Sequence, residues 1–246
     1  MNIQVISIFP AMFDALIDHG VVGRAIREQL LSLSVLNPRD YAGDKHSTID
    51  GRPYGGGPGM VMTPEPMAKA IDAARQQMGA TAKVVHLSPQ GQRFDHAAAQ
   101  MFAEASEPLI LLAGRYEGVD QRVLDHHVDE HWSIGDYVLS GGELAAMVMI
   151  DAIARWIPDS LGNKESAQQD SFVDGLLDCP HYARPEVFDG ESVPEVLLSG
   201  DHQAIKRWRL QQSLGRTWQL RPDLLEKLEL TDEQAQLLEE FKLNLK

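Results

Sequence analysis

The chain has 246 residues, of which 43% are hydrophobic and 24% charged, and its formal net charge is −14. This composition is typical of a globular protein with a sizeable core. No run approaches the ~20 apolar residues that a membrane helix needs, and the N-terminus lacks the pattern of a signal peptide. The one cysteine, Cys179, excludes an intrachain disulfide, favours a cytoplasmic address and is expected to be buried as a small apolar residue.

Strand and helix patterns alternate up to about Ile157. The expected strands are Ile3–Phe9, Leu33–Asn37, Lys83–Ser88, Pro108–Ala113 and Val128–Trp132. The expected helices are Met12–Asp18, Gly23–Leu31, Glu65–Gln77, Asp95–Ala103, Gly118–His126 and Gly142–Ile157. This alternation predicts an α/β fold with a mainly parallel sheet that is covered on both faces, and by itself it suggests a doubly wound strand order.

The pattern changes after Pro158. Residues 159–170 include few apolar side chains and are predicted to form a mobile linker. Strand patterns disappear beyond it, and helices are expected over Asp201–Ser213, Pro222–Leu228 and Thr231–Leu243, the last with a Thr–Gln capping box. The sequence therefore predicts a first domain over 1–158, an interdomain linker over 159–170 and a small helical C-terminal domain over 171–246.

Three glycine-bearing loops follow three of the predicted strands: Leu87–Gly91, Ala113–Gly118 and Ile134–Gly142. In parallel sheets, ligands bind beyond the carboxyl ends of the strands, so these loops are expected to converge on one ligand site. The pair Gly141–Gly142 comes directly before a helix, whose free N–H groups can bind polar ligand atoms. The alternative is an ordinary tight turn.

A basic window in the C-terminal part contrasts with the acidic total. No Asp or Glu occurs from His202 to Pro222, and the window holds two aromatic and five basic side chains: Trp208, Trp218, Lys206, Arg207, Arg209, Arg216 and Arg221. Basic residues neutralise phosphates and aromatic rings stack on unpaired bases, so the window is a candidate nucleic-acid contact. The alternative is a solvated helix face with the tryptophans in the core.

Standard phosphate-loop and dinucleotide motifs are absent. The glycine-rich stretch Tyr54–Met60 has no lysine to hold a phosphate and is predicted to be a flexible flap. His127–His131 matches the H-x-x-E-H pattern of zinc peptidases. That chemistry needs both histidines on one helix face, and the segment runs into a predicted strand, which disfavours a peptidase.

Several stretches together carry a resemblance that spans the chain: Arg52–Met60, Leu87–Gly91, Gly114–Gly118, Trp132–Glu143, Asp170–Phe172, Gly175–Tyr182 and Arg207–Arg209. In these the chain resembles the bacterial tRNA (guanine-N1)-methyltransferase family, of the SPOUT class of trefoil-knotted methyltransferases. The resemblance implies a deep trefoil knot in place of the doubly wound order. It also implies an obligate homodimer with a shared active site, and as substrate the guanosine on the 3′ side of the tRNA anticodon.

The resemblance further implies that S-adenosylmethionine binds in a bent form inside the knot. Carried over by position, its contacts are Gly114, Ile134, Gly135, Asp136, Tyr137, Val138 and Leu139, and the same cavity is lined by Leu87, Ser88, Pro89, Tyr116, Glu117, Gly141 and Gly142. No residue is predicted as a metal ligand. Whether a divalent ion such as Mg²⁺ acts through Glu117 is left open.

Two residues are implied as catalytic. Guanine N1 becomes nucleophilic as its proton leaves, so a base is required, and the resemblance assigns Asp170 to this role and Arg155 to the charge on guanine O6. From the residues alone, Asp170 is a helix N-cap and Arg155 forms an i,i+4 pair with Asp151. A non-catalytic RNA-binding protein on the same scaffold, and a knotted enzyme acting on another RNA, are the alternative functions.

Overall fold

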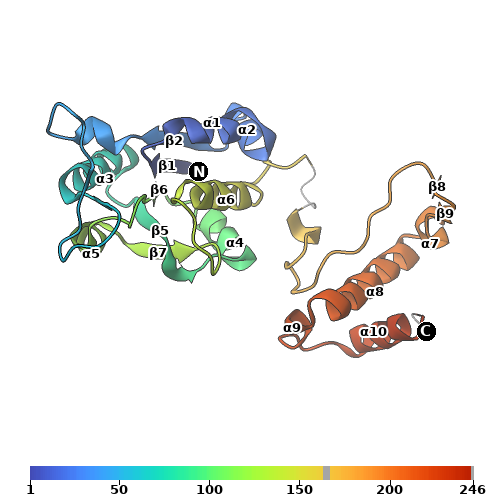
Figure 1. Cartoon of the computed structure of the whole chain (residues 1–246). Coiled ribbons are helices and arrows are strands. Elements are labelled where there is room, and N and C mark those ends of the chain that lie inside the picture. Colours follow the sequence, from blue (N-terminus) through green and yellow to red (C-terminus); the bar gives the residue numbers. More distant parts are fainter. Residues whose placement is uncertain (163–166, 245–246) are drawn as a thin grey trace. The chain divides into compact units, whose positions relative to one another are not determined.

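The computed structural model describes residues 1–162 and 167–244. The chain divides into two compact units, Met1–Lys164 and Glu165–Lys246 (Figure 1). The division falls within the range predicted as a linker, 159–170, of which residues 163–166 lie outside the described residues. In the described part of the chain, no helix is both long enough and apolar enough to cross a membrane.

The first unit is built on a parallel sheet in which all five predicted strands are present. The strands are β1 (Asn2–Ile6), β2 (Ser32–Leu36), β5 (Lys83–Arg93), β6 (Leu109–Leu112) and β7 (Glu130–Ser133), in the order β2-β1-β6-β5-β7 with every pair parallel. The prediction of a mainly parallel sheet is confirmed. A short antiparallel pair, β3 (Asp50–Gly51) and β4 (Val61–Met62), was not predicted.

β5 extends beyond its predicted end at Ser88. Its pairing with β7 is interrupted between Leu87 and Gln92, because the intervening segment bulges out of the ladder. Pro89, which has no N–H to donate to a ladder, lies in this bulge. The predicted loop Leu87–Gly91 is therefore an irregular part of a strand that resumes pairing at Gln92.

The helices of this unit follow the predicted order with shifted ends. They are α1 (Asp14–Asp18, preceded by a 3₁₀ turn at Pro10–Phe13), α2 (Gly20–Arg27), α3 (Pro64–Met78), α4 (His96–Ala105), α5 (Gln121–His127) and α6 (Glu143–Ala154), with a further 3₁₀ turn, η2, at Pro38–Tyr41. α2 ends before Leu31 because Gln29 takes a left-handed conformation, φ 60°. Asp95 caps α4 by accepting from the N–H of Ala98 at 3.0 Å.

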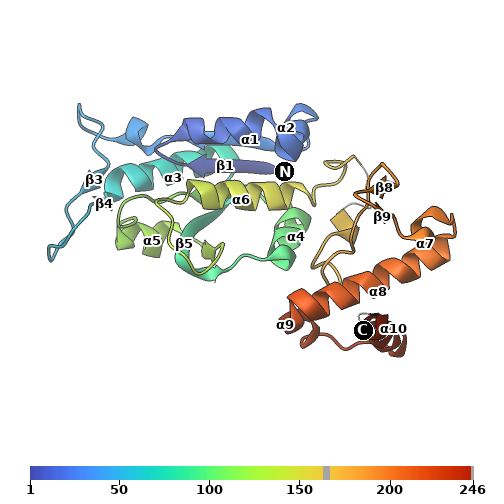
Figure 2. The same ribbon diagram turned by 45° about the vertical axis from the view of Figure 1, so that its right-hand side comes forward.

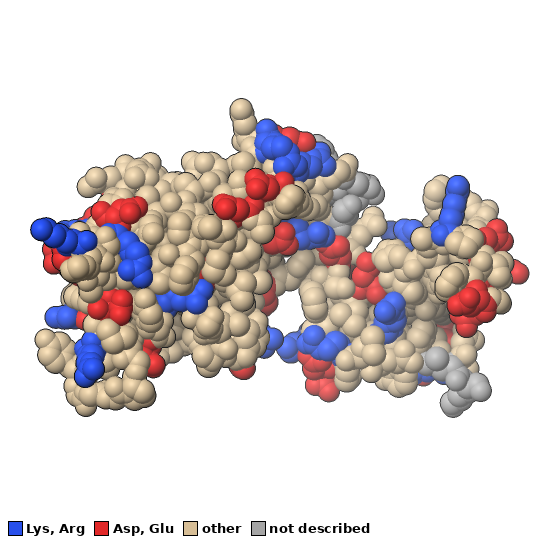
Figure 3. All heavy atoms as spheres, turned by 45° about the horizontal axis from the view of Figure 1, so that its top comes forward, with Lys and Arg blue, Asp and Glu red and all other residues tan. Residues whose placement is uncertain are grey.

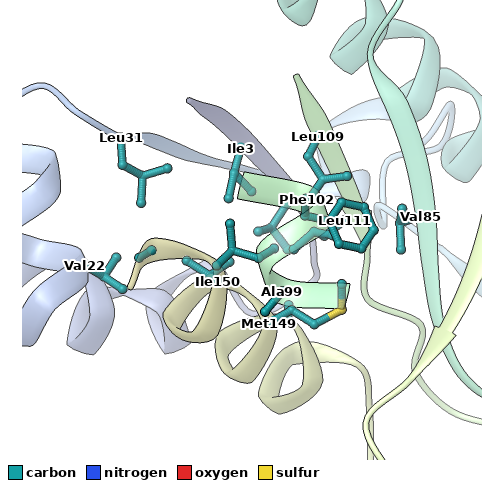
Figure 4. Close-up of a cluster of buried hydrophobic side chains, with 14 of the residues drawn as sticks. Ile3, Val22, Leu31, Val85, Ala99, Phe102, Leu109, Leu111, Met149 and Ile150 are labelled. Carbon is teal, nitrogen blue, oxygen red and sulfur yellow. The ribbon is translucent and has the colours of Figure 1, made fainter. Parts of the chain in front are cut away.

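Helices cover both faces of the sheet (Figure 2), and an apolar cluster lies on each side of it. The period-2 alternation of β6 supplies both: Leu109 and Leu111 belong to one cluster, and Ile110 and Leu112 to the other. Helices α2, α4 and α6 pack on the first side, where Val22, Phe102 and Ile150 meet the strand residues (Figure 4). Helices α3 and α5 pack on the second. With both faces buried, the carboxyl ends of the strands remain as an open edge.

The second unit contains η3 (Ala167–Gln169), a hairpin of β8 (Val187–Phe188) and β9 (Glu191–Ser192), and the helices α7 (Glu195–Leu198), α8 (His202–Leu220), α9 (Pro222–Leu225) and α10 (Asp232–Asn244). The hairpin corrects the expectation that no strand follows the linker; its two-residue strands are too short to give an alternating pattern. Leu214 of α8 and Leu237 of α10 are fully buried at the centre of this unit. The predicted capping box is confirmed, with Thr231 and Gln234 exchanging hydrogen bonds.

Candidate ligand-binding site

A cavity of about 330 Å³ lies beyond the carboxyl ends of β5, β6 and β7. Its walls come from the bulge of β5, the loop after β6 and the loop after β7, so the predicted convergence of three loops is confirmed. The predicted contacts that line it are Leu87, Ser88, Pro89, Gly114, Tyr116, Glu117, Ile134, Gly135, Tyr137, Val138, Leu139, Gly141 and Gly142. Asp136 is the exception: it is exposed and does not line the cavity.

The two central glycines are required by a close approach of two backbones. The N–H of Gly142 donates to the carbonyl of Gly114 at 2.9 Å, and Arg115 and Gly141 form an antiparallel bridge. A Cβ on Gly142 would lie 2.7 Å from the Cα of Ala113. Because the φ of Gly142 is −78°, any residue could adopt its conformation. A glycine is therefore needed at position 142 because Ala113 leaves no room for a side chain, and not because the chain turns sharply there.

An ion pair that the sequence did not predict fixes this contact. Glu143, the first residue of α6, is fully buried. One of its oxygens accepts from Arg115 Nε at 2.8 Å and the other from Ser7 Oγ at 2.8 Å. Arg115 also donates to the carbonyl of Ser140 at 3.2 Å and lies 4.6 Å from the centre of the Phe9 ring. Two cavity walls and the end of β1 are thus joined through one buried carboxylate.

One buried histidine of the cavity lining contacts a partly buried histidine on the neighbouring strand. His86 of β5 lines the cavity and is 6% exposed, and its Nδ1 lies 3.1 Å from Nδ1 of His131 on β7. Burial, and secondarily the nearby His131, lowers the pKa of His86 to about 4, so its ring is neutral at pH 7. His131 stands on a strand and His127 ends α5. The H-x-x-E-H segment therefore does not present two histidines on one helix face, as a zinc peptidase requires.

The two residues implied as catalytic belong to different units, and neither lines the cavity. Arg155 follows the last residue of α6 and is half-buried. Asp170 follows η3, and the residues after it form a turn in which the N–H of Val173 donates to the Asp170 carbonyl at 3.5 Å. No helix begins at this point of the described chain, so the alternative role of Asp170 as a helix N-cap is wrong.

The basic window contains the whole of α8, and its members have different environments. Arg207 makes a bidentate ion pair with Glu240 of α10, with the closest N–O distances at 3.0 Å. Arg209 and Lys206 are exposed. Trp218 is 40% exposed beneath the Lys242 ammonium, so it is not in the core as the alternative interpretation held. Figure 3 shows acidic and basic side chains interspersed over the face in view.

One group in the described residues has donor atoms arranged as metal ligands could be: Asp178, Cys179 and His181, all within 4.8 Å of one another. Asp178 is already bonded to His181 Nε2 at 2.8 Å and to the N–H of Cys179 at 2.7 Å. Burial, and next the Asp178 charge, raises the pKa of the Cys179 thiol, which opposes the thiolate that a metal would need. Cys179 is buried, as predicted.

The fold and the cavity define the class: a parallel α/β protein with a candidate ligand site at the carboxyl ends of three strands. A family model described as tRNA (Guanine-1)-methyltransferase TrmD matches residues 1–227. Among curated relatives, the tRNA (guanine-N(1)-)-methyltransferase of Idiomarina loihiensis is 59% identical over 241 residues, covering 98% of this chain and 95% of the relative. That of Nitrosococcus oceani is 61% identical with the same coverage. The chain belongs to the tRNA (guanine-1)-methyltransferase TrmD family, as its resemblance predicted.

Proposed function

We propose that this protein transfers a methyl group from S-adenosylmethionine to N1 of the guanosine immediately 3′ of the anticodon in tRNA. The observation that carries the proposal is the convergence of three loops on one cavity in a chain that matches the family over residues 1–227. The names of the relatives specify a tRNA guanine and its N1 atom. The position beside the anticodon comes from the sequence resemblance.

The cavity fits S-adenosylmethionine in size and in chemistry. Its volume of about 330 Å³ lies within the usual range for small-molecule sites. Leu87, Pro89, Ile134 and Leu139 supply apolar surface for an adenine ring, and the Glu117 carboxylate supplies negative charge for the cationic end. When bound, this donor supplies a methyl group on a positively charged sulfur. We propose that Mg²⁺, if it is required, is bound by the exposed Glu117. Measuring methyl transfer after the divalent ions have been chelated tests this role.

In the proposed reaction, the Asp170 carboxylate accepts the proton from guanine N1. An ordinary aspartate, with a pKa near ~3.9, is a weak base toward so weak an acid. Arg155 makes guanine N1 easier to deprotonate when its guanidinium lies beside guanine O6, because the negative charge that develops on O6 is then stabilised.

We also propose the trefoil knot. After β7, at the edge of the sheet beside β5, the chain returns to the loop after β6 and pairs Gly141 with Arg115. To do so it must pass the bulge of β5, in which Gly91 packs against the backbone of His131 and Trp132. A passage of this kind through a neighbouring loop is what a knotted sheet requires, and it is rare in other folds.

A homodimer is the third part of the proposal. Leu144 and Val148 lie four residues apart on α6, and with Phe9 they are each roughly half exposed. We propose that a second copy of the chain covers this apolar surface, because a two-fold interface brings the same patch of both subunits together. Sedimentation at micromolar concentration should give a dimer, and Val148→Asp should give a monomer with little activity.

We propose a different binding role for each unit. Unit 1 binds the methyl donor through its cavity, and unit 2 binds tRNA through the exposed basic residues of α8. The protein acts in the cytoplasm, a location that its lone free cysteine favours. A non-catalytic RNA-binding protein is the alternative, and it predicts tRNA affinity without methyl transfer.

One experiment separates these functions. The protein is incubated with labelled S-adenosylmethionine and total tRNA, and the labelled nucleoside is identified by mass spectrometry. The proposal predicts N1-methylguanosine. Asp170→Asn should bind donor and tRNA at parental affinity but transfer at least about 100-fold more slowly, the usual contribution of a general base. Binding of tRNA by the parent without any transfer would favour the alternative.

A further inference from the structure

One exposed element has no role in the site described above. The arm is the stretch Arg52–Met60 between β3 and β4, which includes four glycines and two prolines. Tyr54 near its tip is 100% exposed. Gly55, Gly56 and Gly57 have φ values of 86°, 79° and 112°, and a Cβ on any of them would meet no atom within 4 Å. The tip therefore presents a large aromatic ring to solvent on a glycine backbone without packing support.

The base of the arm is joined to the wall of the cavity. The carbonyl of Met60 accepts from the N–H of Glu117 at 2.9 Å, and the N–H of Met62 donates to the carbonyl of Gly118 at 2.9 Å. A Cβ on Gly59 would overlap the Glu117 carboxylate. Glu117 and Gly118 both line the cavity. The position of the arm is therefore set by the same loop that shapes the ligand site.

The reach of the arm limits what it can touch. Tyr54 is six positions before the anchored Met60, and a stretch of that length spans at most about 20 Å when fully extended. Any partner of Tyr54 must then lie within that distance of the cavity wall. For an RNA whose target base enters the cavity, this limits the contact to nucleotides close to the target and excludes distant parts of the molecule.

The chemistry around the ring favours RNA. Arg52 on the arm is exposed. Arg122 of α5 is 67% exposed in its side chain and pairs with Asp120. That pair raises the pKa of the Arg122 guanidinium, and the Tyr54 phenol adds a smaller contribution in the same direction. An exposed aromatic ring can stack on an unpaired base, and exposed guanidinium groups can bind the adjoining phosphates.

We infer that Tyr54 stacks on an unpaired base of the tRNA anticodon loop next to the methylated guanosine, with Arg52 and Arg122 on the flanking phosphates. This inference rests on the proposed function, since it takes tRNA as the substrate. The arm orients the loop toward the cavity, so Tyr54 is a positioning residue.

The test compares Tyr54→Ala with Tyr54→Phe in the full-length protein. Single-turnover methylation is measured over a range of tRNA concentrations, and S-adenosylmethionine affinity is measured by calorimetry. Tyr54→Ala should weaken tRNA binding by about 5- to 100-fold, the range that base–aromatic stacking gives, with donor affinity unchanged. Tyr54→Phe keeps the ring and should stay within about twofold of the parent. Met101→Ala, which removes an exposed apolar side chain from α4, is the surface control.

A fluorescent base analogue placed beside the target guanosine should be quenched by the parent and by Tyr54→Phe, but not by Tyr54→Ala. Parental tRNA affinity in Tyr54→Ala overturns the inference. Loss of the dimer in sedimentation of Tyr54→Ala also overturns it, since the ring would then contact a second copy of the chain. If the parent itself does not methylate tRNA, the proposed function is wrong, and this result is distinct from a failure of the inference about Tyr54.

Discussion

Arg115 Nε donates to Glu143 Oε2 at 2.8 Å, and this carboxylate is completely removed from solvent. The pair joins the loop after β6 to the first turn of α6, two segments that both line the candidate site. Loss of one partner would leave the other charged group without compensation in the interior. The shape of the cavity therefore depends on the Arg115–Glu143 ion pair, whose carboxylate is not exposed to the cavity.

The first prediction concerns that pair. Arg115→Ala should lower the free energy of unfolding by about 3–5 kcal/mol, the cost of an unpaired buried charge, and should weaken donor binding. Arg122→Ala is the matched control, because its carboxylate partner Asp120 is also 2.8 Å away but the Arg122 side chain is exposed. The free energy of unfolding of Arg122→Ala should fall by no more than about 1 kcal/mol. Denaturant unfolding gives both values, and equal losses would contradict the structural role assigned to Arg115.

The second prediction concerns Gly142. Gly142→Ala places a Cβ 2.7 Å from the Cα of Ala113, and backbone cannot move aside as a flexible side chain can. Calorimetry should show little S-adenosylmethionine binding. Gly43→Ala, where an added Cβ meets nothing within 4 Å, should bind like the parent. Normal affinity in Gly142→Ala would show that the two loops can separate without affecting the site.

The third prediction concerns pH and His86. The pKa of His86 is about 4 when folded, against 6.5 for the free side chain, so the unfolded chain takes up this proton first as the pH falls. Stability should decline below pH 6.5 and reach its full loss near pH 4, amounting to about 3 kcal/mol at ~1.4 kcal/mol per pKa unit. Unfolding at pH 7.5 and 5.0 should show a steeper decline in the parent than in His86→Gln. Equal declines would mean that His86 does not titrate as its burial requires.

The fourth prediction separates the arginines of α8. Arg207 is held by Glu240 and Arg209 is exposed. Arg209→Ala should weaken tRNA binding and reduce its salt slope by about one unit, as expected for one lost phosphate contact. Arg207→Ala should cost at most about 1 kcal/mol of stability, because its ion pair is exposed. Affinity at several salt concentrations, with a melting curve for each variant, checks both. A reversed pattern would place the tRNA contact at Arg207.

Local sequence patterns were sufficient to predict the strands of the sheet and the position of the candidate site. The apolar runs of β1 and β6 are buried on both faces, and such strands are recognisable without tertiary information. The cavity walls were predicted because glycine-bearing loops after parallel strands meet at one edge. The Thr231–Gln234 capping box was predicted because both of its hydrogen bonds are local.

Interactions between distant segments were not predictable in the same way. Ser7 lies more than a hundred residues before Arg115 and Glu143, which are themselves 28 residues apart, and no spacing rule connects the three. The bulge in β5 depends on how β7 pairs with it, and β8 and β9 are too short to alternate visibly. One signal was available for Glu143, since an acidic residue in the first turn of a helix is favoured by the helix dipole.

The most direct test of the central claim uses two tRNA transcripts that differ only in the nucleotide 3′ of the anticodon, guanosine in one and adenosine in the other. Each is incubated with the protein and labelled S-adenosylmethionine, and the products are digested and identified. Our account predicts one methyl group per guanosine-bearing transcript, at N1 of that guanosine, and none on the other. Equal labelling of both transcripts, or a methyl group at any other atom, would contradict it.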